Sequence, residues 1–414
     1  MISELPPGYK QTEVGVIPQD WSLGTFSDLF DFTNGVNADK SAYGRGVPFI
    51  NVLEVITHTH IRFSQISGRV TLTKAQIDSF SVRRGDIVFN RTSETQEEVG
   101  LCSVYLDDEV VVFGGFVIRA RPRRHFLDAV YSGYALRTPV VRSQISAMGQ
   151  GAIRANVGQA DLRKVYAPLP PRSEQEAIAE ALSDTDALIE SLDQLIAKKR
   201  HLKQGAMQEL LTGRRRLLGF VDGWKEALLG DVIEKFVGGG TPSRANASYW
   251  GSEIPWVTVK DFATFSPRHA QEAISMVGLN SSASHLIPKG TLITSTRMAL
   301  GKAVVYEVDV AINQDLKALF PKPILSTQYL YFWFQYRGSF IDALGSGSTV
   351  KGISLPDLKN IDFRLPSFSE QTAIATILSD MDTEIAALEA KLTKTRQLKQ
   401  GMMAELLTGR TRLV

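Results

Sequence analysis

The sequence predicts a pseudo-two-fold duplicated α+β protein, in which two α/β domains are joined by two long helices that form an antiparallel coiled coil. Three observations lead to this prediction. A stretch that begins at Ser173 returns 196 positions later at Ser369, with 27 of 45 residues identical. Both copies carry apolar residues at helical spacing. Fainter similarity also joins the segments before them, and two copies are too few for a solenoid.

Each copy of the repeat is predicted to be one long helix. Prolines exclude helix just upstream, so Ser173 and Ser369 are placed to cap the helix or to lie in its first turn. The sequence LLTG at 210–213 and 406–409 supplies a glycine stop at the other end. The apolar positions with the four-and-three spacing of a coiled-coil seam are Ile178, Leu182, Ile189, Leu192 and Ile196, and then Ile374, Leu378, Met381, Ile385, Leu388 and Leu392.

The order of charges along each copy predicts how the two helices pair. In the first copy, acidic residues such as Glu180 and Asp186 precede basic residues such as Lys203 and Arg214, and the second copy runs the same way. An antiparallel pair places each acidic half beside a basic half, whereas a parallel pair would oppose like charges. Each exposed ion pair is weak, so the pattern predicts orientation rather than stability.

Matching segments outside the repeat place the domain boundaries. Val47–Val52 and Ile254–Val259 are alternating apolar stretches that predict corresponding strands. Each half also has a predicted helix, around 127–147 and 326–344, that ends in a polar loop containing glycine. The predicted segments are a first domain at 1–168, a first helix segment at 169–217, a second domain at 218–365 and a second helix segment at 366–414.

Composition limits the class of protein. The chain has 414 residues, of which 43% are hydrophobic and 22% charged, which is typical of a globular protein with room for two domains. Cys102 is the single cysteine, so no disulfide framework is expected. A net charge of +2 gives no sign of nonspecific nucleic-acid binding. Without a signal pattern or a membrane-length apolar run, we expect a cytoplasmic protein.

Motifs for catalysis are missing or misplaced. The chain has no P-loop, no dinucleotide-binding glycine pattern and no Asn-Pro-Pro-aromatic tetrapeptide. Asp357 with Glu389 and Lys391 imitates a magnesium-dependent nuclease signature, but the last two lie within the repeated helix. The six histidines form no HExxH pattern. We therefore expect no catalytic residue, no metal site and no cofactor bound to this chain.

The openings LP-x-x-SEQ-x-AI and the endings ELLTGR frame both helices, and GGGTPSRANASYWGSEIPWVTVKD and ITSTRMALGKAVVY lie at 238–261 and 293–306. With these features the whole chain resembles the specificity subunit of a type I restriction–modification enzyme. The resemblance implies that 1–168 and 218–365 are target-recognition domains and that the two helix segments are spacers.

The same resemblance implies the partners. Each domain would read one half of a bipartite site in double-stranded DNA, and the helices would set the gap and dock two methyltransferase subunits. Two restriction subunits, with ATPase and endonuclease activity, would join for cleavage. S-adenosylmethionine, ATP and Mg²⁺ would belong to these partner subunits, and no membrane is involved.

Polar residues at strand ends and in glycine loops are the candidates for DNA contact. Arginine suits guanine, Asn and Gln suit adenine, and Ser, Thr and Lys more often hold phosphate. The candidates are Asn90, Arg91, Thr92, Ser93, Gln150 and Arg154 in the first domain, and Thr241, Ser243, Arg244, Lys260, Ser295, Thr296, Arg297, Lys302, Ser346, Ser348 and Lys351 in the second. Arg91 and Arg297 correspond if the second half carries one extra residue, so Arg297→Ala is expected to weaken binding to all sequences alike.

Two other functions fit the same features. A coiled-coil scaffold that binds proteins would share the near-neutral domains. A DNA-binding adaptor of another defence complex, without a methyltransferase partner, would share every motif quoted. The sequence leaves open the half-sites and the gap length, because base readout depends on loop geometry.

Overall fold

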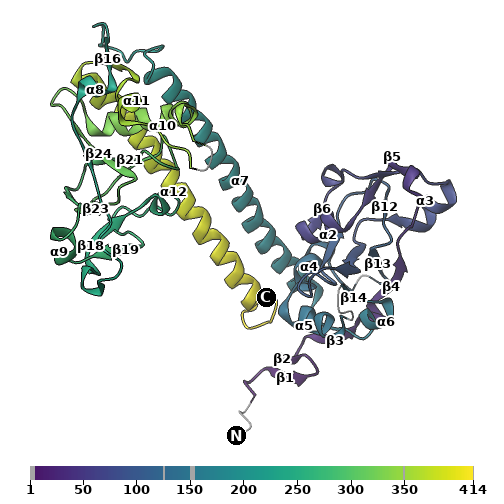
Figure 1. The fold of residues 1–414 in the computed structure, drawn as a ribbon. Helices are drawn as coiled ribbons and strands as arrows, with labels where there is room; N and C mark the ends of the chain where they lie inside the picture. The colour runs from purple at the N-terminus through teal and green to yellow at the C-terminus, as the bar shows by residue number, and fades with distance from the viewer. Residues whose placement is uncertain (1–4, 125, 150–153, 348–349, 414) are drawn as a thin grey trace. The chain divides into compact units, whose positions relative to one another are not determined.

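The computed structural model describes residues 5–124, 126–149, 154–347 and 350–413. The chain folds into two compact units, unit 1 (Met1–Leu192 with Lys391–Val414) and unit 2 (Asp193–Ala390). Two 39-residue helices, α7 (Arg172–Leu210) and α12 (Phe368–Leu406), each contribute to both units (Figure 1). Unit 1 is therefore assembled from two separate segments of the chain, whereas unit 2 is one continuous segment.

Unit 1 is built on two main sheets. The larger has the order β4-β13-β9-β11-β6 and is antiparallel except that β6 runs parallel to β11. The smaller has the order β7-β5-β12-β8, with β5 and β12 parallel. The strands of these sheets are β4 (Phe30–Asn34), β5 (Tyr43–Ile50), β6 (His60–Ile61), β7 (Arg69–Val70), β8 (Ser81–Val82), β9 (Ile87–Asn90), β11 (Cys102–Tyr105), β12 (Val111–Phe113) and β13 (Val117–Pro122).

Shorter elements complete unit 1. Three two-stranded ladders pair β1 with β2, β3 with β15, and β10 with β14. The remaining strands are β1 (Tyr9–Thr12), β2 (Gly15–Pro18), β3 (Ser22–Thr25), β10 (Thr92–Ser93), β14 (Ala155–Asn156) and β15 (Tyr166–Leu169). The helices are α1 (Phe26–Leu29), α2 (Val52–Thr57), α3 (Lys74–Phe80), α4 (Ala129–Ala135), α5 (Pro139–Met148) and α6 (Gln159–Leu162).

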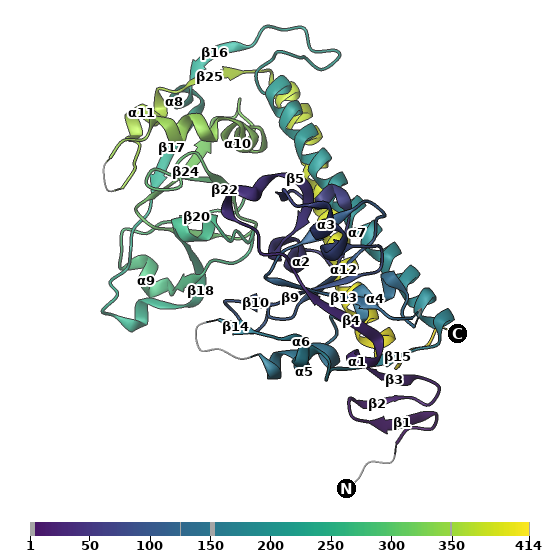
Figure 2. The ribbon, with the colours of Figure 1, turned by 90° about the vertical axis from the view of Figure 1, so that its right-hand side faces the viewer.

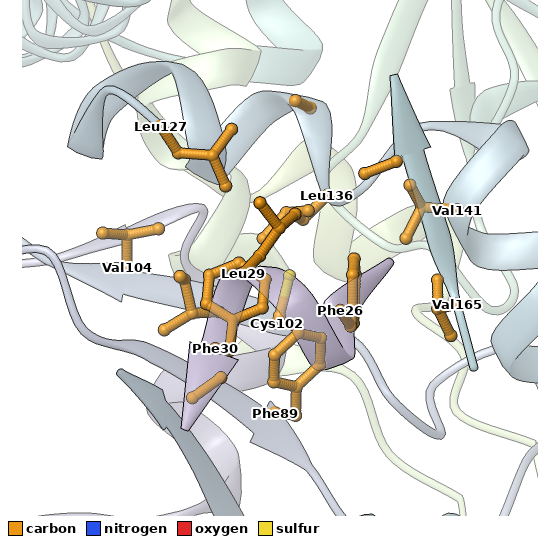
Figure 3. Close-up of a cluster of buried hydrophobic side chains, with 14 of the residues drawn as sticks. Phe26, Leu29, Phe30, Phe89, Cys102, Val104, Leu127, Leu136, Val141 and Val165 are labelled. Atoms are coloured by element: carbon orange, nitrogen blue, oxygen red, sulfur yellow. The ribbon is translucent and has the colours of Figure 1, made fainter. Parts of the chain in front are cut away.

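The main core of unit 1 is rich in aromatic rings. Phe26 and Phe30 meet edge to face, with ring centroids 5.3 Å apart, and both are fully buried. Phe89 of β9 and Cys102 of β11 lie in the same cluster (Figure 3). Rings in this geometry bury much apolar surface and also favour particular orientations. Burial raises the pKa of the Cys102 thiol to about 11, so this sulfur is an inert part of the core.

Unit 2 repeats this plan. One four-stranded sheet has the order β17-β24-β21-β22, and the other has the order β19-β18-β23-β20. The strands are β16 (Lys225–Leu228), β17 (Ile233–Gly238), β18 (Trp250–Val257), β19 (Glu272–Ile274), β20 (Leu286–Ile287), β21 (Leu292–Ser295), β22 (Ala303–Val305), β23 (Val310–Ile312), β24 (Leu316–Pro321) and β25 (Asp362–Leu365), which pairs with β16. The helices are α8 (Leu229–Val232), α9 (Met276–Asn280), α10 (Thr327–Leu344) and α11 (Leu355–Lys359).

The two units differ in one helix, which a proline divides in unit 1. The helix predicted around 127–147 is two helices in unit 1, because α4 ends at Ala135 and α5 begins at Pro139. Proline lacks a backbone N–H and fits only the first turn of a helix. The corresponding α10 of unit 2 is continuous, with Phe332 and Phe334 buried. The aromatic run at 329–334 is therefore part of a core helix.

The two long helices pair antiparallel within each unit, as the charges predict. In unit 1, the ammonium of Lys399 lies 2.6 Å from the carboxylate of Asp186. In unit 2, Lys203 lies 2.6 Å from Asp382. Lys203 and Lys399 occupy the same position of the repeat, and so do Asp186 and Asp382. One ion pair thus occurs twice, which is what a two-fold relation between antiparallel helices produces.

The predicted seam residues lie on the covered side of the helices to different extents. Ile189, Met381 and Leu388 are partly buried, and the other eight are buried. Ile178 and Leu182 belong to the core of unit 1 together with Leu406, the last residue of α12, and Leu407, which follows it. The ends of the seam are therefore continuous with the hydrophobic cores of the units. The first turns of each long helix pack against a domain as well as against the other helix.

Candidate functional site

The polar ends of β9 and β21 form the centre of the candidate site in each unit. In unit 1, the N–H of Gly85 donates to the carbonyl of Tyr105 in the turn before β9. In unit 2, the N–H of Gly290 donates to the carbonyl of Tyr306 in the same way. Both strands begin two residues after these glycines. The second half therefore has no extra residue between this glycine and the end of the strand. The sequence alignment that assumed one is wrong.

This register changes which residues correspond. The carbonyl of Arg91 accepts a hydrogen bond from Val157 at 3.0 Å, and the carbonyl of Thr296 accepts one from Ile353 at 2.9 Å. Arg91 therefore corresponds to Thr296, and Arg297 lies one residue further on. The two arginines are not equivalent, which removes the reason to give them the same role.

Four of the predicted contact residues are buried: Asn90, Ser93, Ser295 and Thr296. The amide of Asn90 donates to the carbonyl of Glu98 at 3.1 Å, and the hydroxyl of Ser93 donates to the Glu98 carboxylate at 2.8 Å. The hydroxyl of Thr296 donates to a backbone carbonyl at 3.0 Å. In this conformation these side chains hold the strand ends and the following loops in place.

The more accessible candidates of unit 1 surround β10 and β14, which lie beside the end of β9 (Figure 2). The hydroxyl of Thr92 donates to Asn156 at 2.7 Å across this short ladder. Arg91 is half-buried and donates to a backbone carbonyl at 3.4 Å. Arg154 is exposed, with a 3.6 Å ion pair to Glu94. The predicted contact Gln150 lies outside the described residues.

In unit 2, a cationic loop surface follows β21. Arg297 is 57% exposed and lies 3.6 Å from Asp315. Lys302 is exposed, and Lys351 forms a 2.7 Å ion pair with Asp342. The predicted Ser346 is exposed and its backbone pairs with the segment after Lys351. Ser348 lies outside the described residues.

The glycine loop before β18 holds a preformed arrangement around Arg244. Its guanidinium binds Glu272 through two hydrogen bonds and lies 3.7 Å from the ring centroid of Trp250. These hydrogen bonds lower the pKa of the Glu272 carboxyl, which is therefore ionised at neutral pH. Because Glu272 occupies the planar edge of the guanidinium, Arg244 is not free to read guanine in this conformation.

The other candidates of this region are exposed. Thr241 donates its hydroxyl proton to Gln314 at 2.7 Å, and Ser243 accepts a hydrogen bond at its backbone carbonyl from the indole of Trp250 at 3.2 Å. Lys260 lies in the short 3₁₀ turn after β18. The candidates thus lie at the ends of corresponding strands, β9 and β21, in both units, and in unit 2 also in the loops before and after β18.

Comparison with known proteins now decides the family. Residues 18–198 and 221–399 each match the type I restriction modification DNA specificity domain. The chain belongs to this family. It carries two copies of the domain, and as a DNA-specificity subunit it recognises DNA sequence and is not an enzyme.

Individual relatives span the chain. A candidate type I restriction enzyme specificity subunit of Methanocaldococcus jannaschii, MjaX, is 24% identical over 420 residues, covering 98% of this chain and 97% of the relative. A type I restriction enzyme specificity subunit of Escherichia coli is 30% identical over 197 residues, covering 45% of this chain and 48% of the relative. The crystal structure of the S subunit of the type I restriction-modification system of M. genitalium has the same fold, with a TM-score of 0.59 at 19% identity, covering 97% of this chain and 99% of that one.

The specificity-subunit fold also explains the repeated Ser-Glu-Gln sequence, whose role the sequence alone did not reveal. Glu174 is buried, and Arg412 donates to both of its oxygens at 2.6 and 2.8 Å. The indole of Trp21 donates to the same carboxylate at 2.8 Å, and Arg412 also binds Asp20. The start of α7 is thereby joined to the segment that follows α12.

Unit 2 contains the same cluster. Arg216 donates to both oxygens of the buried Glu370 at 2.6 and 2.8 Å, and the indole of Trp224 donates at 2.9 Å. Each tryptophan recurs at the start of its half, and each arginine recurs after LLTG, so recurrence was the available signal. Sequence reasoning assigned these arginines to the basic helix ends and missed their bond to the other helix.

The next residue of the repeated sequence fixes a loop. The amide of Gln175 donates to the carbonyls of Phe126 and Pro170 and accepts the N–H of Asp128 at 2.8 Å. Gln371 makes the corresponding three bonds in unit 2. Both glutamines are buried. They join the start of each long helix to the loop before α4 or α10.

In the part of the chain that the structure describes, no group of three or more His, Cys, Asp and Glu side chains is placed to hold a metal ion. Among the described helices, none has the length and apolar character that crossing a lipid bilayer requires.

Proposed function

We propose that this chain is the specificity subunit of a type I restriction–modification complex and that each unit reads one half of a bipartite double-stranded DNA site. The main support for this proposal is the duplication of the unit. The two units share a framework, yet unlike side chains such as Thr92 and Arg297 occupy corresponding loop positions. Two readers of different half-sites need such unlike tips, because base edges are distinguished by side-chain chemistry.

The exposed or half-exposed candidates are the proposed DNA contacts, and the buried ones support them. The proposed contacts are Arg91, Thr92 and Arg154 in unit 1, and Thr241, Ser243, Lys260, Arg297, Lys302, Ser346 and Lys351 in unit 2. Gln150 and Ser348 stay in the proposed set. Arg244 is proposed as a positioning residue, because Glu272 and Trp250 already bind its guanidinium.

Arg297→Ala is expected to weaken binding selectively at one base pair of the half-site read by unit 2. The corrected register makes Arg297 particular to this unit, and a bidentate arginine contact contributes about 1–3 kcal/mol of base discrimination. Binding to single-substitution variants of the site would be measured by fluorescence anisotropy. Lys302→Ala is the control, since loss of a phosphate contact lowers affinity for all variants alike. A uniform loss for Arg297→Ala would contradict the base-reading role.

We propose that the paired helices set the gap between half-sites and dock two methyltransferase subunits. A repeated apolar patch supports the docking surface. Leu202 is 51% exposed and Leu398 is 60% exposed, and they occupy the same position of the repeat. Gly205 and Gly401, three residues further on, have open space beside them. Near Leu398 this patch forms a mostly apolar groove of 690 Å³.

Two copies of one patch suit two copies of one partner. Leu202→Ala and Leu398→Ala are each expected to weaken methyltransferase binding by about tenfold, because an exposed leucine gains its apolar burial only in the complex. The double variant should release both subunits. Co-purification and analytical ultracentrifugation with the methyltransferase would measure this. Normal binding by the double variant would place the docking surface elsewhere on the helices.

The remaining partners belong to the complex as a whole. We propose that two restriction subunits join for cleavage and that S-adenosylmethionine, ATP and Mg²⁺ bind the partner subunits. A cytoplasmic location, where such a complex meets DNA, is part of the same proposal.

Methylome sequencing tests the proposed function. DNA from a host that expresses this chain with its methyltransferase should carry methylation at a motif of two short half-sites separated by a fixed gap. Deleting seven residues from both long helices should change or abolish the gap without changing either half-site. A soluble complex that adds no sequence-specific methylation would instead favour a protein scaffold.

A further inference from the structure

Met298, in the loop after β21, has an unusual backbone conformation. Its φ angle is +57°, and among the described residues it is the only one other than glycine with a positive φ. Its side chain is 47% exposed. A side chain without local hydrogen-bonding groups is disfavoured in this region, and strained backbone of this kind concentrates at functional sites. The loop therefore holds an apolar side chain in solvent at a conformational cost.

The fold fixes this conformation from both sides. The N–H of Met298 donates to the carbonyl of Lys351 at 2.8 Å. The hydroxyl of Ser295, which is buried, accepts the N–H of Arg297 at 3.2 Å. Arg297 also pairs with Gly352 through a backbone bridge. The position of Met298 is thus set by the end of the sheet rather than by its own side chain.

Three cationic residues are close to Met298 in the sequence or through its backbone contact, and two of them, Arg297 and Lys351, are paired with the carboxylates of Asp315 and Asp342. Arg297 precedes Met298 and forms a 3.6 Å ion pair with Asp315, and its side chain is more than half exposed. Lys302 is exposed four residues later, and Lys351 is half-exposed beside the Met298 backbone. Among these cations, one apolar tip fits a partner that is anionic overall and carries isolated methyl groups. Duplex DNA has this chemistry, because phosphates flank the 5-methyl group of thymine in the major groove.

Unit 1 differs at this position. The corrected register places Ser93 where unit 2 has Met298, since Ser93 pairs with Ala155 as Met298 pairs with Lys351. Ser93 is buried and bound to Glu98 at 2.8 Å. At this one position the framework thus carries an exposed methionine in unit 2 and a buried serine in unit 1. A position that contributes to reading two different half-sites is expected to carry different side chains in the two units.

We propose that Met298 is a specificity-determining residue that contacts the 5-methyl group of one thymine in the half-site read by unit 2. The inference rests on the proposed function. Arg297, the neighbouring residue, reads an adjacent base, and the constrained backbone presents the thioether toward the groove. Methionine suits such a contact because its side chain is polarizable and adapts to the surface it meets.

The test uses the full chain in complex with its methyltransferase, on the bipartite site identified by methylome sequencing. Each thymine is replaced in turn by deoxyuridine, which removes only the methyl group, and the dissociation constant is measured by fluorescence anisotropy. For the unchanged protein we expect one thymine, in one half-site, whose replacement weakens binding about fourfold, the change for one buried methyl group. Met298→Ala should lose this sensitivity while still binding the deoxyuridine site.

Two further variants separate a contact from a structural role. Met298→Gly relieves the backbone strain, since glycine adopts positive φ readily, and it should also lose the sensitivity. Met276→Ala removes an equally exposed methionine, 47% exposed, from the same unit and should keep it. Sensitivity that survives Met298→Gly, a half-site without a sensitive thymine, or half-sites that contain no thymine would overturn the proposal. Failure of the unchanged complex to bind its own site would instead contradict the proposed function.

Discussion

Glu174→Ala is expected to destabilise unit 1 by about 2 kcal/mol and to release the segment around Arg412. The carboxylate is buried and accepts three hydrogen bonds, two from Arg412 and one from the indole of Trp21. Removing one partner of a buried ion pair leaves the other charge uncompensated, at a cost of about 3–5 kcal/mol. The side chain of Arg412 is a quarter exposed and keeps Asp20 as a partner, which lowers the expected cost.

Thermal unfolding and hydrogen exchange would measure this effect. Exchange should rise in the segment after α12, because its bond to α7 is lost, and in the hairpin of β1 and β2 near Trp21. Glu176→Ala is the matched control, since Glu176 lies two residues away on the same helix but is exposed and forms an exposed ion pair with Arg172. That variant should stay within about 0.5 kcal/mol of the original chain. Equal stability of the two variants would show that the buried cluster is not needed for folding.

Leu378→Ala is expected to destabilise unit 2 by about 3 kcal/mol, the loss typical of a leucine removed from a packed core. Leu378 is fully buried in the cluster formed by α12, α10 and the end of α7. The truncation leaves a cavity that the surrounding helices fill only in part, so contacts are lost on several elements at once.

Urea unfolding, with exchange measured separately for each unit, would test this prediction. Leu398→Ala is the matched control, because it is the same substitution on the same helix at a 60% exposed position. It should leave stability within about 0.5 kcal/mol while weakening methyltransferase binding. The pair thus separates loss of packing from loss of partner contact. An unchanged midpoint for Leu378→Ala would mean that the seam contributes little to folding.

Periodicity and recurrence were strong signals for the helices. The apolar spacing predicted helices that run from Arg172 to Leu210 and from Phe368 to Leu406 in the structure. The glycine stops were also placed correctly, since Gly213 and Gly409 have φ near +70° just after the helix ends and glycine tolerates that angle. The order of charges predicted antiparallel pairing, because the direction of pairing depends only on which helix ends repel each other.

The candidate site was less predictable, because strand ends and loops carry no period. An insertion of one residue aligned Arg91 with Arg297, although the backbone hydrogen bonds from Val157 to Arg91 and from Ile353 to Thr296 show that Arg91 corresponds to Thr296. Alternation along a strand turns neighbouring side chains to opposite faces, so this error of one residue changed the inferred role. Burial of Asn90 and Ser295 was equally hidden, since polar residue type predicts exposure only on average.

The sequence by itself determined the duplication, the length and orientation of the helices and the family, because these depend on residue spacing and recurrence along the chain. Only the tertiary structure decided which residues, distant in the sequence, contact one another. The bond between Glu174 and Arg412 joins positions 238 residues apart, and Arg244 is bound by Glu272, 28 residues away. Met298 likewise donates its backbone N–H to the carbonyl of Lys351, 53 residues away in the sequence. Such pairings arise from chain packing, and local sequence does not encode their partners.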